Sequence, residues 1–310
     1  MKKTVKTVIS IICVIAIIVC GGYLVRFFYL GYRGEQSVQK AASLLITDEK
    51  TEDEEKKLKE EYRKKYPNVD FPDGLLLKYY PLYAKNQDLR GWISIPELKV
   101  DYPLVQGKNN DYYLHKNINK EYDYWGTPFF DYRNKFNPDS QNLTLFGHNS
   151  PVFKDKVFAK LNVYLTVGGY KRAPVIKCDT IFEEAYWKVY AVFITNAKPK
   201  DDNGQCFNYM VSDFPSEEDF WTYISEINER SIYSTGVDIS ENDELLTIST
   251  CNYSFDGARM IIVCRKVRKG ENADVNLSLV ATNKSPKYPQ AWYDEKGVSN
   301  PYKNAPKWES

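Results

Sequence analysis

One uninterrupted apolar segment near the N-terminus constrains this 310-residue chain more than any other feature. No charged side chain occurs from Thr7 to Val25, and most of the segment is aliphatic. About 20 apolar residues, at about 1.5 Å of helical rise each, match the roughly 30 Å hydrocarbon core of a bilayer. Lysines precede the segment and Arg26 follows it. Because lysines favour the cytoplasmic side, we expect the chain after about residue 30 to lie outside the cell.

Two kinds of cleaved N-terminus are alternative interpretations of this segment. A secretory signal peptide has an apolar region of about 7–15 residues and ends at a small-x-small site. No good site of this kind follows the segment here. A lipoprotein signal ending at Cys20 would normally have a small residue in front of the cysteine, whereas Val19 stands there. The prediction is an uncleaved single-pass anchor within residues 1–30.

Composition and charge exclude two broad classes of protein. The chain is 43% hydrophobic and contains 25 Tyr and 15 Phe, so it can bury a substantial core and is not disordered overall. Its formal net charge is only +1. Nucleic-acid binding usually requires a clear basic excess or patch, so we expect no nucleic-acid partner.

The six cysteines do not follow the pattern of a disulfide framework. Cys13 and Cys20 lie in the apolar segment, and Cys264 lies within an apolar strand pattern, where a buried thiol acts as a small hydrophobic residue. Cys178 and Cys206 could pair, but sequence spacing does not decide this.

Composition divides the rest of the chain into three predicted segments. Residues 31–74 form a charged linker whose stretch 35–66 is expected as one helix, either a solvated stalk or packed on the domain. A surface that binds the cell wall or a partner is the alternative. Residues 75–268 form the globular domain. Residues 269–310 are rich in Asn, Lys, Pro and Ser, and are expected to be a poorly ordered tail or an appendage on the domain.

The globular segment is predicted to be mainly β. Short strand patterns separated by turn residues indicate a closed or nearly closed barrel. The expected strands are 92–96, 100–105, 127–131, 142–148, 175–178, 186–195, 244–250 and 259–267. Residues 216–230 are expected to be a helix with Ser216 as its N-cap, and a shorter helix is expected over 156–164.

Three reactive side chains are expected at strand ends of this barrel. Cys251 follows a strand and opens a loop, and Arg259 begins the antiparallel strand after that loop. A nearby cation favours a thiolate and can stabilise an oxyanion. His148 also ends a strand and precedes a loop, whereas His115, the only other histidine, lies in a helical turn where surface exposure is expected. A cysteine, a histidine and an arginine at three strand ends predict acyl-transfer chemistry. The alternative is that Cys251 is a structural thiol beside a surface arginine.

The motifs around these residues resemble those of the sortases. The stretch LTISTC at 246–251, followed by Arg259, is similar to their TLxTC…R signature, and 142–149 is similar to their histidine-bearing strand. Stretches 110–114 and 126–134, with the long helix before the cysteine strand, resemble class B. The resemblance covers about residues 75–268 and the N-terminal anchor.

The resemblance implies a sortase β-barrel and a cysteine transpeptidase that needs no cofactor and no metal. Cys251 would attack the Thr carbonyl of a sorting motif near the C-terminus of a secreted protein and form a thioester. An amine of the cell-wall cross-bridge or of its lipid-linked precursor would then resolve this intermediate. His148 would be the general acid/base, and Arg259 would hold substrate and oxyanion.

The resemblance also implies a substrate groove lined by Asn110, Leu114 and Ser249. Asn252, directly after the nucleophile, departs from the acidic residue often found there, which leaves the details of motif preference open.

Three alternative functions remain open at this stage. A membrane-tethered cysteine protease would use the same nucleophile with water as acceptor. A pilin-polymerising sortase would use a pilin lysine as acceptor. A non-enzymatic wall-binding or assembly protein would merely bury Cys251. The tail at 271–310 could cover the cleft.

Overall fold

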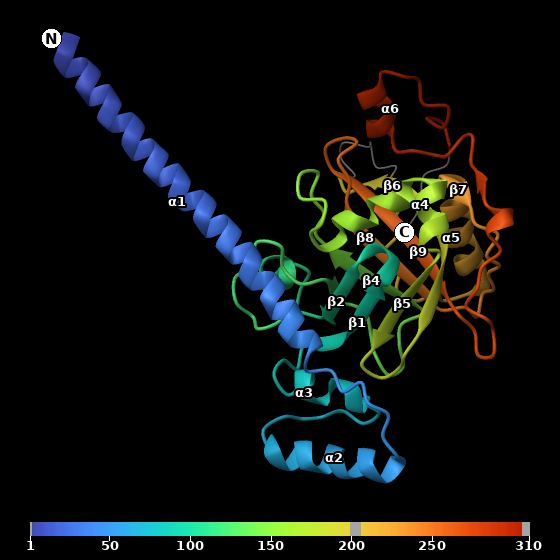
Figure 1. Ribbon diagram of the computed structural model, residues 1–310. Helices are drawn as coiled ribbons and strands as arrows, with labels where there is room; N and C mark the ends of the chain where they lie inside the picture. Colours follow the sequence, from blue (N-terminus) through green and yellow to red (C-terminus); the bar gives the residue numbers. More distant parts are fainter. Residues whose placement is uncertain (1, 199–205, 306–310) are drawn as a thin grey trace.

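A closed barrel of eight strands forms the centre of the molecule (Figure 1). The computed structural model describes residues 2–198 and 206–305. Around the barrel the strands follow the order β1-β2-β3-β4-β8-β9-β6-β5, and β5 pairs with β1 to close it. The strands are β1 (Leu89–Ile95), β2 (Val100–Val105), β3 (Phe129–Phe130), β4 (Asn142–Gly147), β5 (Val175–Thr180), β6 (Tyr186–Asn196), β8 (Leu245–Cys251) and β9 (Ala258–Lys266). The predicted mainly-β closed barrel is confirmed.

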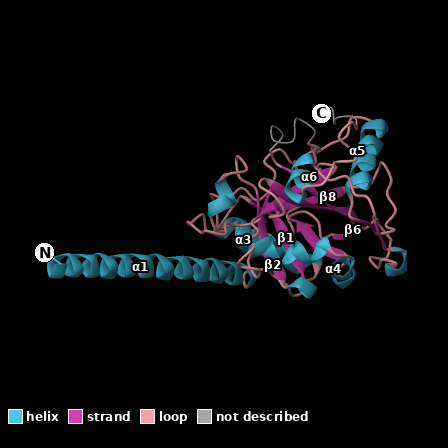
Figure 2. Cartoon of the chain, turned by 90° about the horizontal axis from the view of Figure 1, so that it is seen from above, coloured by secondary structure: helices cyan, strands magenta, loops and turns pink. Residues whose placement is uncertain are grey.

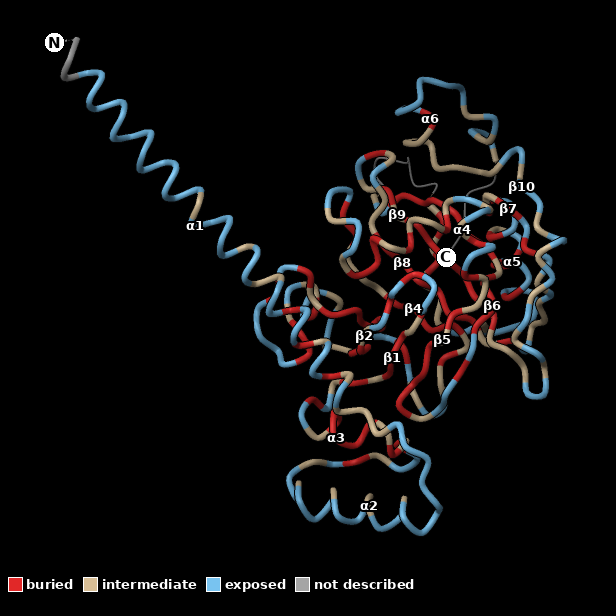
Figure 3. The backbone as a smooth tube through the Cα atoms, viewed as in Figure 1, coloured by how far each residue is buried: buried red, intermediate tan, exposed pale blue. Residues whose placement is uncertain are grey.

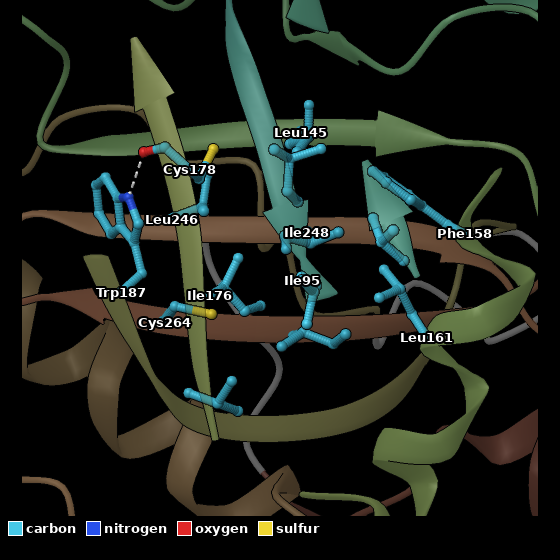
Figure 4. Close-up of a cluster of buried hydrophobic side chains, with 14 of the residues drawn as sticks. Ile95, Leu145, Phe158, Leu161, Ile176, Cys178, Trp187, Leu246, Ile248 and Cys264 are labelled. Atoms are coloured by element: carbon cyan, nitrogen blue, oxygen red, sulfur yellow. Dashed lines mark hydrogen bonds between the residues drawn. The ribbon is translucent and has the colours of Figure 1, made fainter. Parts of the chain in front are cut away.

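The barrel interior is filled by the inward-facing residues of these strands. Because side chains alternate across a strand, one apolar set from each strand points to the common core. Figure 4 shows part of this cluster, including Ile95, Leu145 and Ile248. Cys264 is fully buried there, as the sequence predicts. Cys178 is also a buried free thiol, so it forms no disulfide with any other cysteine.

Helices cover the barrel and connect its strands. The helix α5 (Glu217–Arg230) begins as predicted, since Ser216 accepts a hydrogen bond from the backbone N–H of Asp219. Its apolar stripe packs on β6, β8 and β9. The segment expected as a short helix is instead the 3-10 helix η4 (Val157–Leu165). Further short helices are η1 (Leu77–Tyr79), α3 (Tyr80–Tyr83), η2 (Pro96–Leu98), η3 (Tyr112–His115), α4 (Val167–Arg172) and η5 (Leu277–Leu279).

The stretch 35–66 is divided between two separate helices, so the single helix expected there is wrong. The helix α1 runs over Lys2–Ala42 and α2 over Glu52–Lys65. Apolar residues 44–46 pack on the domain between them, which turns the chain. Thr51 then starts α2 with a reciprocal capping box to Glu54.

The N-terminal part of α1 extends away from the domain (Figure 2) and is exposed along its length (Figure 3). The part of α1 from Val5 to Ala42 is long and apolar enough to cross a membrane, and its most apolar window is not buried. This agrees with the sequence prediction of a spanning segment by length and composition.

The C-terminal residues 269–305 lie against the domain. The short strands β7 (Tyr233–Ser234) and β10 (Ala281–Thr282) pair with each other, and the helix α6 (Gln290–Lys296) follows. Tyr288 and Trp292 stack with ring centroids 4.1 Å apart and pack against a cluster of Ile194, Phe255 and Ala258, of which Phe255 lies in the loop between β8 and β9. Residues 306–310 of the predicted tail lie outside the described residues. The predicted segment boundaries at 30, 74 and 268 stay predictions.

Candidate active site

Three strand ends bring Cys251, His148 and Arg259 to one end of the barrel. In the antiparallel pair of β8 and β9, Cys251 lies directly opposite Arg259. Such cross-strand partners have Cβ atoms about 4.5–5.5 Å apart. In the parallel pair of β4 and β8, Gly147 lies opposite Thr250, so His148 and Cys251 are the next residues on neighbouring strands.

Hydrogen bonds tie the histidine loop to the cysteine loop. The Asn149 side chain donates from Nδ2 to the backbone oxygen of Cys251 at 2.6 Å. The hydroxyl of Tyr253 donates to the backbone oxygen of Asn149 at 2.7 Å. Because both bonds are short and join residues at or beside Cys251 and His148, they fix the spacing of the two loops. Sequence reasoning did not single out Asn149 or Tyr253, and their only signal was adjacency to the motif residues.

The imidazole of His148 is held in a defined tautomer. Its Nε2 lies 2.8 Å from the backbone oxygen of Leu114. A carbonyl only accepts, so Nε2 carries the hydrogen and Nδ1 is the proton acceptor of the neutral ring.

The surroundings of His148 favour its neutral form. Burial lowers the pKa of His148 below its ordinary value of 6.5, and the nearby His115 and Arg259 lower it further, whereas the bond to Leu114 opposes this shift. The rings of His148 and His115 stack with centroids 5.5 Å apart and planes 27° from parallel. His115 is exposed in η3, as predicted, but its contact with His148 was missed because the two residues are distant in sequence.

Tyr209 is a second residue of the site that the sequence did not indicate. Its hydroxyl lies 2.8 Å from the hydroxyl of Ser249, and the pair is buried. Burial raises the pKa of Tyr209, and Arg259, Asp131 and Cys251 also act on it electrostatically. Through this contact with Ser249, Tyr209 reaches β8 two residues before Cys251.

The three predicted groove residues lie in different settings. Leu114 contacts His148 through its backbone oxygen. Ser249 is buried two residues before the cysteine, where it contacts Tyr209. The Asn110 amide is used within the protein: Nδ2 donates to Asp131 at 3.1 Å and Oδ1 accepts from the backbone N–H of Tyr132 at 3.0 Å. Their role in binding stays a prediction.

Asn252 organises the loop that follows Cys251. Its side-chain oxygen accepts hydrogen bonds from the backbone N–H of Ser254 at 2.9 Å and from the Ser254 hydroxyl at 2.5 Å. Its backbone N–H donates to the oxygen of Ala258 at 2.9 Å. An uncharged residue at this position therefore closes the turn between Cys251 and Arg259.

Comparison with known proteins agrees with this barrel fold. A family model described as the sortase domain matches residues 93–267. The chain therefore belongs to the sortases, which are cysteine transpeptidases.

The more specific similarity is to class B sortases. The chain is 32% identical to sortase B of Listeria monocytogenes over 191 residues, which cover 61% of this chain and 73% of that protein. The X-ray structure of Clostridium perfringens sortase B matches with a TM-score of 0.54 at 30% identity, over 60% of this chain and 98% of that one. A sortase B structure from B. anthracis shares the fold, with a TM-score of 0.62 at 23% identity over 78% of this chain and 99% of that one. These similarities make the chain a class B sortase.

Proposed function

We propose that the chain is a membrane-anchored transpeptidase whose nucleophile is Cys251. It cleaves a C-terminal sorting motif of secreted proteins at a Thr carbonyl and transfers the protein to a cell-wall amine. The observation that carries this proposal is the direct pairing of Cys251 with Arg259, with His148 at the end of the neighbouring strand.

The first half-reaction forms a thioester. The neutral His148 takes the thiol proton at Nδ1, and the Cys251 sulfur attacks the Thr carbonyl carbon. The guanidinium of Arg259 stabilises the resulting oxyanion. As the C–N bond breaks, the imidazolium returns its proton to the leaving amine, and the acyl group stays on sulfur.

The second half-reaction transfers the acyl group to an amine. The acceptor nitrogen attacks the thioester carbonyl while His148 takes its proton. The C–S bond then breaks and the sulfur of Cys251 leaves, taking back the proton held by His148, so a new amide forms and the thiol and the neutral imidazole are regenerated. Water in place of the amine gives hydrolysis, the reaction of the alternative protease.

The sorting motif is proposed to bind along Asn110, Leu114 and Ser249. The contact of Leu114 with His148 and the position of Ser249 two residues before Cys251 support this location. Asn110 would act at the far side of the groove, through the loop that holds Asp131.

The proposed location is the outer face of the cell membrane. The length of α1 and the lysines in front of its apolar segment support a single span with a cytoplasmic N-terminus. In this arrangement, residues 1–30 are the anchor, 31–74 the linker, 75–268 the catalytic unit and 269–310 the tail.

A peptide-cleavage assay in the presence of hydroxylamine or an oligoglycine amine tests the proposal. We expect the amine adduct as the main product with the native chain, and none with Cys251→Ala. The matched control is Cys206→Ala, which removes another partly exposed thiol. Cleavage with water as the only acceptor would favour the protease, and transfer only to a lysine side chain would favour pilin polymerisation. Full activity of Cys251→Ala would refute the assigned nucleophile.

A further inference from the structure

Aromatic side chains gather on α1 directly after the apolar segment. Tyr and Trp are enriched where a spanning helix passes through the lipid headgroups. Several of these aromatic residues are exposed, namely Tyr23, Phe28, Tyr29 and Tyr32. They indicate that the outer membrane–water boundary lies around residues 23–32 of α1.

Phe27 contacts the catalytic domain at the same height along α1 as these exposed aromatic residues. Its ring centroid lies 5.3 Å from that of Tyr124 and 5.3 Å from that of Phe153. Phe27 follows the end of the apolar segment at Val25 by two residues, or about 3 Å of helical rise. The loops that carry Tyr124 and Phe153 therefore lie at the depth of the headgroups when α1 spans a bilayer.

Polar contacts further along α1 fix this placement of the domain. Arg33 forms an ion pair with Glu121 at 2.8 Å, and Glu35 forms one with Lys156. Gly34 lets the helix approach closely, because a Cβ at this position would overlap the carboxylate of Asp123. The orientation of the barrel relative to α1 is therefore set by specific contacts.

Four exposed side chains from three loops surround the active site on the side of the domain that contacts Phe27. Val152 lies four residues after His148, Tyr253 lies two residues after Cys251, and Tyr122 and Tyr124 come from the loop between β2 and β3. Their exposed fractions are 74% for Val152, 54% for Tyr253, 55% for Tyr122 and 45% for Tyr124. The rings of Tyr122 and Tyr124 each lie 6.3 Å from the ring of His115, which stacks on His148. The Tyr253 hydroxyl donates to the backbone oxygen of Asn149, next to His148, so the loops lie together.

We propose that Tyr122, Tyr124, Val152 and Tyr253 form a membrane rim that inserts into the headgroup region of the outer leaflet. The inference rests on the proposed anchoring by α1 and adds a second contact with the bilayer. Its occupant is the lipid surface, because the rim is continuous with the aromatic residues of the spanning helix. The active site then opens at the membrane surface, where an acceptor amine carried on a lipid can reach the thioester by lateral diffusion.

The opposite end of the barrel provides an internal control. Tyr186 begins β6, whereas Asn196 at its other end pairs with Ala258 beside the active site. At about 3.3 Å per residue, these ends are roughly 30 Å apart. Tyr186 is 49% exposed, like the rim tyrosines, but lies far from the contacts with Phe27. Figure 1 shows that the helix α2 also lies away from the N-terminal half of α1, the part proposed to span the membrane.

Fluorescence quenching on the full chain in vesicles tests the rim. The starting variant keeps the buried Cys178 and Cys264 and replaces the other cysteines with alanine, namely Cys13, Cys20, Cys206 and Cys251. Separate Val152→Cys, Tyr186→Cys and Leu24→Cys versions carry an environment-sensitive fluorophore. Vesicles of phosphatidylcholine and phosphatidylglycerol contain a lipid with a nitroxide in its headgroup. Because Val152 is highly exposed, its substitution does not disturb the core.

We expect strong quenching and a blue-shifted emission at position 152, and neither at position 186. Equal, weak quenching at 152 and 186 with strong quenching at 24 would overturn the rim but leave the anchor. Weak quenching at all three positions would overturn both. The catalytic proposal is tested separately by transfer to a soluble amine.

A kinetic comparison gives the rim a second, independent test. We expect Val152→Asp in the otherwise native chain to lower transfer to an amine carried on a vesicle lipid several-fold, and to leave transfer to soluble oligoglycine unchanged. An equal effect on both acceptors, or no effect on either, would contradict the inference.

Discussion

The substitution Gly147→Ala tests how closely the histidine strand is packed. Gly147 ends β4 directly before His148, and an added Cβ would stand 2.9 Å from Phe158 Cγ and closer still to the ring edge. Phe158 is fully buried in the barrel core, so its ring has no free space to move into. Overpacking of this kind costs about 1–3 kcal/mol. Alanine also reduces the conformational freedom of the unfolded chain relative to glycine, which offsets about 0.4–1 kcal/mol of this cost. The expected net loss in the free energy of unfolding is about 1–2 kcal/mol.

Thermal unfolding of the full chain in detergent, followed by near-UV circular dichroism, measures this loss. For a domain of this size we expect Tm to fall by about 2–8 °C. Gly168→Ala is the matched control, because a Cβ there meets no atom within 4 Å. In a Gly147→Ala/Phe158→Leu double variant, the total loss should be smaller than the sum of the single losses, since the smaller side chain relieves the overlap. Equal Tm values for the two alanine variants, or strictly additive losses, would refute the reasoning.

Four further outcomes are expected from other parts of the structure. Arg259→Lys should slow acyl-enzyme formation about 10²-fold in single-turnover kinetics, because a point charge replaces a planar donor at the oxyanion. Burial lowers the pKa of His148, so the unfolded chain binds the imidazole proton more readily than the folded chain does. The stability of the fold should therefore decrease as pH drops below about 6.5. His148→Gln should flatten this part of a plot of the urea unfolding midpoint against pH. Glu271→Gln should cost about 1–3 kcal/mol in thermal unfolding, since Glu271 pairs with the fully buried Arg265, which keeps Asp238 as a second partner. Trp292→Ala should speed hydrogen exchange in residues 252–257, where the tail packs on the catalytic loop; unchanged exchange would show that the tail does not support this loop.

The barrel and the set of strand-end residues could be predicted from the sequence. Strand alternation and the turn residues between strands are local signals, and they located the eight barrel strands to within a few residues. Placing Cys251 and Arg259 on paired strands needed only the short loop between them. The N-cap of α5 at Ser216 was likewise visible, because capping depends on residues close in sequence.

Features that depend on tertiary contacts could not be predicted in this way. The packing of residues 44–46 on the domain is one such feature. The start of α2 at Thr51 does carry a local signal, the capping box with Glu54, which sequence reasoning missed. His115 reaches His148 because Leu114 holds the imidazole at the barrel end. The contact of Tyr209 with Ser249 joins two segments that are distant along the chain.

The most direct test of the account is the identity of the covalent intermediate. The full chain is mixed with a library of sorting-motif peptides, quenched in acid and measured by intact mass and by peptide mapping. The account predicts one acyl adduct, joined through its Thr carbonyl to Cys251, which hydroxylamine removes and which Cys251→Ala lacks. An adduct on another residue, or peptide cleavage at the native rate by Cys251→Ala, would contradict it.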